Sequence, residues 1–404
     1  MSRYRWVILG VSLLGFMQAH IHRVGFAPLI PIFMQDLGIS YAAAAAIMTA
    51  YFWTYTVVQL PVGVLTDRLG PRRMMLVFLA VLGAGVLAFP LSGSYAQSLV
   101  TRGIIGLGAA GIWLPGLRLI HEWFPSQERG RATGLLSAGG GVGGTLALML
   151  LPVLAGRFGW RWGYAATLVP LLAALVLIYA FVRPGPLAEA RSGAAASRGA
   201  TAALRHVAST RALWAINVAV FFSYGAFIAL VTFLPSFLQR QEGLSPGRAG
   251  FVTGLVAAGT VISWPLAGFV SDRLGRRKLI YLSSQILCVA ACVAFALLVP
   301  GRGAGAAAAA ALFTGFVLGG MVTPFVMVVE LFPADLIGTA SGVVNTFCFI
   351  GSLLIPVLVG KILDVSGSFP AAFMACAAFE ALALASAAFT RETGVATGRP
   401  VMVA

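Results

Sequence analysis

Two stretches of the sequence resemble each other closely, and together they decide the fold. Residues 63–73 read Gly-Val-Leu-Thr-Asp-Arg-Leu-Gly-Pro-Arg-Arg, and residues 268–278, which lie 205 positions further along, read Gly-Phe-Val-Ser-Asp-Arg-Leu-Gly-Arg-Arg-Lys. A second pair of stretches, Glu122-Trp-Phe-Pro125 and Glu330-Leu-Phe-Pro333, repeats with nearly the same spacing. The chain is therefore predicted to consist of two similar halves.

Long apolar segments surround these repeated stretches. Of the 404 residues, 59% are hydrophobic and only 10% are charged, and the mean hydropathy is +0.94. A helix that spans a bilayer needs about 20 mostly apolar residues, and lipid offers its backbone no hydrogen-bond partners. We therefore predict an all-α polytopic membrane protein, with twelve transmembrane helices in two pseudo-symmetric six-helix bundles. The predicted spans are residues 7–33, 42–65, 74–92, 97–120, 132–156, 162–182, 212–238, 250–270, 279–299, 305–329, 339–361 and 369–390.

One polar segment separates the two halves. Residues 183–211 are rich in Ala, Gly, Ser and Arg, which is typical of a linker whose basic residues lie against anionic lipid headgroups. The predicted domains are an N-terminal bundle at residues 1–182, a basic cytoplasmic linker at residues 183–211 and a C-terminal bundle at residues 212–404. Parallel six-helix repeats are typical of transporters that hold their substrate between the two halves.

The charge of the chain reflects its topology. The net charge is +15 and the pI is near 10.7, but most of the 27 basic residues fall in cytoplasmic loops if the N-terminus is inside. We therefore predict a lipid bilayer, and no nucleic acid, as the partner of these residues. The first apolar run follows Arg3 and Arg5 and is too long for a signal-peptide core, so it is expected to be an uncleaved span. The predicted location is the bacterial inner membrane, with both termini in the cytoplasm.

The sequence offers no pattern for catalysis or cofactor binding. The four cysteines lie in apolar spans without metal-ligand spacing, and the four histidines are scattered. The glycine-rich run at residues 139–144 lies within an apolar span and favours close helix packing over phosphate binding. We predict neither an enzyme, nor a metal site, nor a cofactor.

The repeated pattern G-x-x-x-D-R-x-G-x-[RK]-[RK] resembles the hallmark loop of the major facilitator superfamily. Arg102-Gly-Ile-Ile-Gly106-Leu-Gly108 is similar to the R-x-x-x-G-x-G pattern of the fourth span in that superfamily. His20-Ile-His22-Arg23, with Asp36-Leu-Gly38-Ile-Ser40 beyond it, resembles the first span of anion:cation symporters for organic acids. The resemblance covers essentially the whole chain and implies secondary transport of a small anion by alternating access. A monomer is expected, because one twelve-helix chain encloses its own pathway.

The repeated loops are predicted to form a cytoplasmic gate. Asp residues can cap or pair at helix ends, and Arg residues can reach acids at the ends of neighbouring helices. The acids expected there end the fourth and tenth spans. The predicted gate residues are Asp67, Arg68, Arg72 and Glu122 in the first half, and Asp272, Arg273, Arg276 and Glu330 in the second.

Charges within the spans point to the substrate. A lone Arg in the middle of a bilayer costs about 2.5–3.5 kcal/mol, so it normally faces a substrate or ion pathway. Arg23 and Arg102 occupy such positions, whereas Phe227 and Ala310 stand at the equivalent places of the second half. An unbalanced pair of positive charges favours an anionic substrate. Arg118 is expected to pair within its own helix and is left out of the binding site. The predicted substrate-binding residues are Arg23, Arg102, His20, His22, Tyr51, Tyr224 and Asn345.

Histidine is the predicted proton carrier in this chain. The Asp and Glu that the organic-acid symporters carry in their first and fourth spans are His22 and Ala109 here. Histidine has an unperturbed pKa of about 6.5 and can replace a carboxyl group as a proton carrier. His22 is therefore assigned to coupling, with His20 as the neighbouring candidate. The alternative is that both only form hydrogen bonds between helices.

Other functions remain open at this stage. A proton-driven drug exporter of the same superfamily fits the loss of both acids, but leaves the two arginines without a role. Nitrate-type porters resemble the chain less, because residues 41–65 and 250–270 carry no charge where those porters place Arg. A transporter-like sensor is the candidate from another class, and it lacks an appended signalling domain in this sequence.

Overall fold

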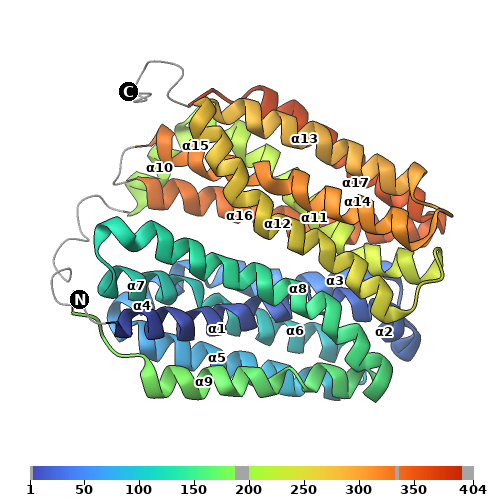
Figure 1. Ribbon diagram of the computed structural model, residues 1–404, viewed down its shortest axis with the longest axis horizontal. Coiled ribbons are helices and arrows are strands. Elements are labelled where there is room, and N and C mark those ends of the chain that lie inside the picture. The colour runs from blue at the N-terminus through green and yellow to red at the C-terminus, as the bar shows by residue number, and fades with distance from the viewer. Residues whose placement is uncertain (1–2, 187–199, 333–335, 394–404) are drawn as a thin grey trace. The chain divides into compact units, whose positions relative to one another are not determined.

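A computed structural model describes residues 3–186, 200–332 and 336–393. Within these ranges the chain is helical and contains no β-strand, so the predicted all-α class is confirmed for them (Figure 1). Two compact units can be distinguished. The first comprises residues 1–195 and 245–254, and the second comprises residues 196–244 and 255–404.

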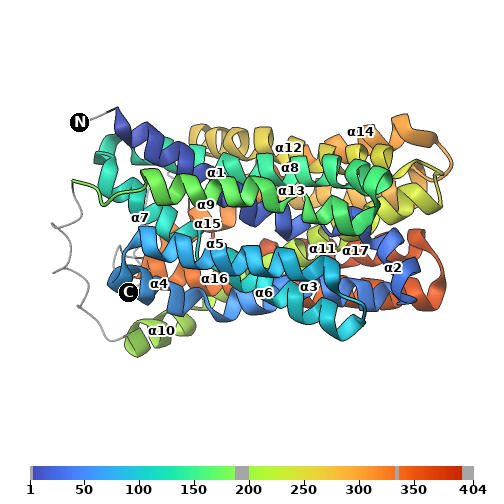
Figure 2. The same cartoon turned by 90° about the horizontal axis from the view of Figure 1, so that it is seen from below.

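The first unit contains the helices of the N-terminal half. α1 packs closely against α8 and also contacts α9, and α6 packs against both α3 and α5 (Figure 2). Ser40 and Ser94 begin α3 and α6 as N-caps, each accepting a hydrogen bond from a backbone N–H in the first turn. The elements are α1 (Tyr4–Val24), η1 (Ala27–Leu29), α2 (Ile30–Leu37), α3 (Tyr41–Val57), α4 (Gln59–Leu69), α5 (Pro71–Ala88), η2 (Phe89–Leu91), α6 (Tyr95–Ala110), α7 (Trp113–Trp123), α8 (Ser126–Ala165) and α9 (Leu168–Phe181).

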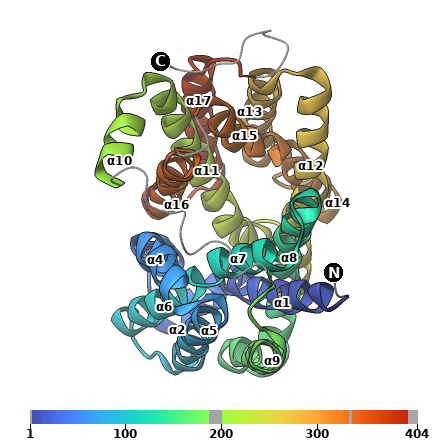
Figure 3. The ribbon, with the colours of Figure 1, turned by 90° about the vertical axis from the view of Figure 1, so that its left-hand side faces the viewer.

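The second unit is built in a similar way. α11 packs against α16 and α17, and α13 packs against α17, as the end-on view in Figure 3 shows. The elements are α10 (Ala200–Ser209), α11 (Arg211–Arg240), α12 (Pro246–Leu274), α13 (Arg277–Val293), η4 (Ala294–Leu298), α14 (Gly303–Val317), η5 (Leu318–Val322), α15 (Thr323–Leu331), α16 (Ile337–Ser366) and α17 (Phe369–Ala388). The first residues of α12 belong to the first unit.

Ten helical segments of the described chain are long and apolar enough to cross a membrane. Two local features explain why this number differs from the twelve predicted ranges. α3 and α4 together cover the predicted span 42–65, but they are divided at Val58 and are therefore counted as shorter helices. The predicted spans 132–156 and 162–182 lie within one segment, Arg131–Phe181, which is interrupted at Gly159 with φ 79° and ψ 155°. Gly tolerates this backbone conformation, which other residues rarely adopt.

The predicted linker is partly helical. Its residues 200–209 form α10, which packs against α11 and α16. Val207 of α10 is buried in the same apolar cluster as Leu213 and Val344. Residues 187–199 of the predicted linker lie outside the described residues. The described end of the linker is therefore part of the second unit.

Two glycines of the fourth predicted span explain how α6 approaches its neighbours. A Cβ atom at Gly106 would collide with the backbone carbonyl of Tyr51 on α3, and one at Gly108 would collide with the backbone of Leu82 on α5. In α8, a Cβ atom at Gly143 would lie 2.5 Å from the Met17 carbonyl oxygen of α1. The absence of side chains thus allows close helix packing, as expected for the glycine-rich run. It also brings Arg102, one turn before Gly106, against α3.

Candidate functional site

Arg102 is completely buried and is bonded to backbone carbonyls. Its Nη1 donates to His22 O at 2.7 Å, its Nε to Ile47 O at 3.3 Å and its Nη2 to Met48 O at 3.2 Å. A buried charge is costly unless hydrogen bonds satisfy it, and these three carbonyls do so. Arg102 therefore connects α6 to the end of α1 and to the middle of α3.

Arg23 lies close to Arg102 but is only half-buried. The two guanidinium carbons lie 5.8 and 5.6 Å from the centroid of the same ring, that of Tyr51. Arg23 also lies 5.0 Å from the centroid of the Tyr55 ring, and the Tyr51 hydroxyl donates to Ala19 O at 3.2 Å. The first unit thus concentrates two positive charges around one tyrosine, and Arg23 is the more accessible of the two.

The hydrogen bonds of His20 define its protonation state. Arg23 Nη1 lies 3.3 Å from His20 Nε2, and His20 Nδ1 lies 3.4 Å from Phe16 O. Because a guanidinium group can only donate, Nε2 must accept and the proton must sit on Nδ1, facing the carbonyl oxygen. His20 is therefore neutral in this arrangement and holds the Arg23 side chain in place.

His22 is buried on the other side of α1. Its Nδ1 lies 3.3 Å from the Tyr164 hydroxyl of α8, and its Nε2 is buried without a hydrogen-bond partner in the described part of the chain. Its backbone carbonyl accepts the shortest of the Arg102 hydrogen bonds. A proton added to Nε2 would therefore place a second positive charge close to Arg102. Such a proton requires a nearby negative charge to balance it.

The remaining predicted binding residues belong to the second unit. Tyr224 of α11 is partly buried against the apolar cluster of α11 and α16, and its ring lies 6.4 Å from that of Phe227. Asn345 of α16 is partly buried. Asn217, two turns before Tyr224 on α11, is fully buried and neither polar atom of its side chain has a hydrogen-bond partner. The second unit thus adds amide and hydroxyl groups but no described arginine at these positions.

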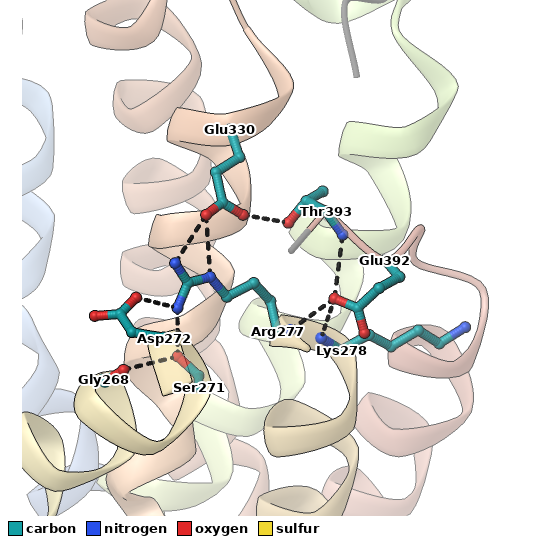
Figure 4. Close-up of polar contacts among 8 residues, drawn as sticks. All are labelled: Gly268, Ser271, Asp272, Arg277, Lys278, Glu330, Glu392 and Thr393. Atoms are coloured by element: carbon teal, nitrogen blue, oxygen red, sulfur yellow. Dashed lines mark hydrogen bonds and ion pairs between the residues drawn. The ribbon is translucent and has the colours of Figure 1, made fainter. Parts of the chain in front are cut away.

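The second repeated loop forms a dense polar network around Arg277 (Figure 4). Arg277 forms ion pairs with Asp272 and with Glu330, the latter at 2.9 Å, and its Nη1 donates to Ser271 Oγ at 2.7 Å. Only 8% of Arg277 is exposed. The network joins the end of α12, the beginning of α13 and the end of α15.

Glu392, which follows α17, caps the beginning of α13. Its Oε1 accepts from the backbone N–H groups of Arg277 at 2.6 Å and Lys278 at 3.1 Å. The next residue, Thr393, donates its hydroxyl to Glu330 Oε2 at 2.7 Å. A carboxylate at a helix N-terminus satisfies free N–H groups and interacts favourably with the helix dipole. The segment after α17 is therefore part of the same network (Figure 4).

The first loop shows a different arrangement in its described part. Glu122 pairs with Arg118 at 3.1 Å and accepts the N–H of Gly185 at 3.2 Å. Arg72 donates to Tyr179 O at 2.6 Å. The Arg118 pair is the intrahelical one that the sequence predicted. The side chains of Asp67 and Arg68 lie outside the described residues.

The predicted gate residues of the second loop lie in two kinds of surroundings. Asp272 and Glu330 lie in the network, whereas Arg273 and Arg276 are exposed and form no ion pair within the described residues. Arg277 occupies the central position instead. The repeat contained the signal, because the offset of 205 residues that relates the loops pairs Arg72 with Arg277. Glu392 could not be found in this way, because it lies far from both loops in the sequence.

Comparisons with known proteins identify the family. The sequence profile of the Major Facilitator Superfamily matches residues 9–356 and 243–400. The chain belongs to this superfamily. The predicted resemblance is therefore confirmed, and the protein is a transporter with multiple membrane-spanning helices, not an enzyme.

Several relatives within the superfamily are similar over most of their length. A probable sulfoacetate transporter of Cupriavidus necator is 24% identical, covering 92% of this chain and 90% of the relative. A hexuronate transporter of Bacillus subtilis is 24% identical, covering 91% and 90%. A probable nitrate/nitrite transporter of Mycobacterium tuberculosis is 27% identical, covering 83% and 84%. Organic-acid and inorganic-anion transporters are thus about equally similar to the chain.

The fold also matches a solved transporter. A bacterial homolog of the human lysosomal transporter Spinster, in an inward-facing and unoccupied conformation, superimposes with a TM-score of 0.81 at 18% identity. The match covers 96% of this chain and 97% of the other. At this identity the match supports the superfamily fold alone.

Proposed function

We propose that this superfamily member is a secondary active transporter that moves a small carboxylate-type organic anion together with protons across the bacterial inner membrane. In this proposal twelve helices form two six-helix halves, residues 1–182 and 212–404, joined by the cytoplasmic segment 183–211. Both termini lie in the cytoplasm, and the protein acts as a monomer by alternating access. The similar order of helices in the two units and the two copies of the loop pattern support this organisation.

The arrangement of Arg23 and Arg102 around the ring of Tyr51 is the observation that carries the proposal. Two guanidinium groups at one place inside a membrane protein create a strong positive potential, and such a site attracts an anion. The names of the relatives support an anion as well, because they include sulfoacetate, hexuronate and nitrate/nitrite transporters.

Within this site the two arginines have different roles. Arg102 donates hydrogen bonds to three backbone carbonyls and is too deeply buried to contact the anion. It therefore supplies positive charge and holds α6 against α1 and α3. Arg23 is half-buried and is oriented by His20, so its fork can bind a carboxylate through two parallel hydrogen bonds. Tyr51 completes the proposed site in the first unit, and we keep the assignment of Tyr224 and Asn345 of the second unit to substrate binding.

His22 is the proposed proton carrier in the first unit. Its Nε2 is buried without a hydrogen-bond partner, and the charge of Arg102 opposes protonation there. An anion bound at Arg23 offsets that charge, so the proton and the anion bind more favourably together than alone. Such mutual stabilisation is what coupling of the two fluxes requires.

The loop networks are proposed to act as the cytoplasmic gate. Arg277 ties the ends of three helices together through Asp272 and Glu330. Breaking these contacts changes the equilibrium between conformations without touching the anion site. Asp67, Arg68, Arg72 and Glu122 have the corresponding role in the first half.

An inorganic anion is the second candidate substrate, because the nitrate/nitrite relative is as similar as the organic-acid relatives. The forked geometry of Arg23 suits the planar oxygens of nitrate as well as those of a carboxylate. The two candidates therefore have to be separated by measurement.

A flux assay with purified protein in lipid vesicles tests the proposal. Labelled sulfoacetate, a hexuronate, nitrate and a cationic dye are offered separately, with and without a pH gradient. We expect pH-dependent uptake of an organic anion and no transport of the dye. Transport of nitrate alone would show that the substrate is an inorganic anion, the second candidate. Transport of the dye alone would contradict an anion site.

The Arg23→Lys variant tests the site itself. Lysine keeps the charge but loses the fork, so anion affinity is expected to fall by about 1.5–3 kcal/mol, the range for one charged hydrogen bond. Arg248→Lys, at an exposed arginine, is the matched control and should bind normally. Wild-type affinity in Arg23→Ala would eliminate the proposed anion site.

A further inference from the structure

Glu380 is an acid in the middle of a membrane helix. It lies at the eleventh position after Phe369, the first residue of α17, and eight residues before Ala388, the last. Every other acid within the described helices lies within two residues of a helix end. Glu380 also lies in the middle of the predicted span 369–390.

The environment of Glu380 contains no described cation. The residue is 2% exposed, and its Oε2 is buried without a hydrogen-bond partner among the described residues. The titratable groups in its neighbourhood are Tyr281, Cys288 and Cys292 of α13, together with Cys376, one turn earlier on α17. Thiols are weak hydrogen-bond donors. A carboxyl group in such surroundings is most stable as the neutral acid, because nothing there balances a negative charge.

One face of α13 carries a row of side chains that begins in the network around Arg277. Arg277, Tyr281, Gln285 and Cys288 follow one another at spacings of three or four residues, so they share one face of α13. Gln285 donates to the Tyr281 hydroxyl at 3.3 Å, and Tyr281 packs in one cluster with Ala387 of α17. α17 therefore faces this row of side chains, and the row begins at the gate.

We propose that the Glu380 carboxyl group is a second proton-binding site of the transporter, which takes up and releases one proton in each transport cycle. The inference rests on the proposed function, since it assigns a second coupling proton to the same anion flux. The packing of α17 does not require an acid, because an amide or an apolar side chain would fill the same space. An ionisable group inside a membrane domain is costly and marks a functional position.

The proposal fixes the charge that crosses the membrane. A monovalent anion that moves with the His22 proton alone carries no net charge. With the Glu380 proton added, each cycle moves one positive charge inward. An electrical potential should then change the rate of uptake by wild-type protein. It should not change the rate of uptake by a variant that cannot bind the second proton.

The decisive variant is Glu380→Gln, which keeps the shape of the neutral acid and cannot bind a proton. Vesicles are given either a pH gradient or an inside-negative potassium diffusion potential with valinomycin, and uptake of a monovalent anion is measured. We expect the potential to accelerate uptake by wild-type protein and by Cys376→Ser, the packing control one turn away. Glu380→Gln should respond to the pH gradient only. An equal response of wild type and Glu380→Gln to the potential would overturn the proposal.

An infrared measurement separates this inference from the proposed function. Purified protein without substrate should show a protonated carboxyl band that weakens as the pH is raised and that Glu380→Gln lacks. If wild-type protein binds none of the tested anions, the proposed function fails, and the infrared titration still decides whether Glu380 exchanges a proton. A band that does not change with pH, or that persists in Glu380→Gln, would refute the second proton site.

Discussion

Replacing Arg102 by lysine tests whether this arginine stabilises the fold or binds the anion. The guanidinium group reaches the His22 carbonyl of α1 and the Ile47 and Met48 carbonyls of α3 at the same time. The lysine ammonium group is a single point with three donors. It can stay at one of these helices, but it cannot connect both in the geometry of the planar fork.

The cost follows from the hydrogen bonds that are lost. Each bond to a charged group contributes about 1.5–3 kcal/mol, and lysine is expected to keep one of the three. Arg102→Lys should therefore lower the free energy of unfolding by about 3–6 kcal/mol. Folded domains are stable by only roughly 5–15 kcal/mol, so the loss should be easy to detect. The effect on anion affinity should be smaller than that of Arg23→Lys.

Unfolding in mixed micelles with increasing dodecyl sulfate, followed by tryptophan fluorescence, measures this loss. Arg23→Lys is the comparison, because that side chain contacts His20 of its own helix and lies over two tyrosine rings. It should unfold close to the wild-type midpoint. If Arg102→Lys unfolds like the wild type and loses more than tenfold in anion affinity, Arg102 is a ligand and its structural role is refuted.

Three further measurements test coupling, gating and topology. His22→Gln should abolish uptake driven by a pH gradient while anion exchange continues, and full accumulation by this variant would remove His22 from coupling. Asp272→Asn should reduce turnover and leave equilibrium anion affinity unchanged, because Asp272 belongs to the proposed gate and not to the proposed anion site; loss of binding would contradict that role. On a background without the native cysteines, a cysteine at exposed Ser94 should react with an impermeant thiol reagent in intact cells, whereas one at exposed Ser209 should not. Labelling of Ser209 from outside would reverse the proposed orientation.

The fold was predictable because it depends on features that are continuous along the chain. Apolar segments of about 20 residues must become helices in lipid, and the helices of the structure cover the predicted ranges. Local backbone events were not predictable in this way. The break at Gly159 and the division at Val58 depend on how neighbouring helices pack, and hydropathy does not record that.

The candidate site was predictable in its residues but not in its contacts. Arg23 and Arg102 stood out as charges in apolar spans, yet nothing in the sequence showed that carbonyl oxygens satisfy Arg102. These contacts form because Gly106 has no side chain and lets α6 approach α3, and the sequence alone does not show which helix α6 approaches. Glu380 is not among the predicted site residues, because the prediction was based on the basic residues within the spans. Its place in the last span is nevertheless evident from the sequence.

The cap that Glu392 places on α13 has a consequence for the order of assembly. Chains are synthesised from the N-terminus, so α13 enters the membrane before Glu392 exists. Asp272, Arg277 and Glu330 can meet earlier, but the free N–H groups at the beginning of α13 gain their carboxylate only after α17 has been made. The network around Arg277 is therefore completed late in biogenesis, and a chain that stalls before α17 has been made would leave the beginning of α13 uncapped.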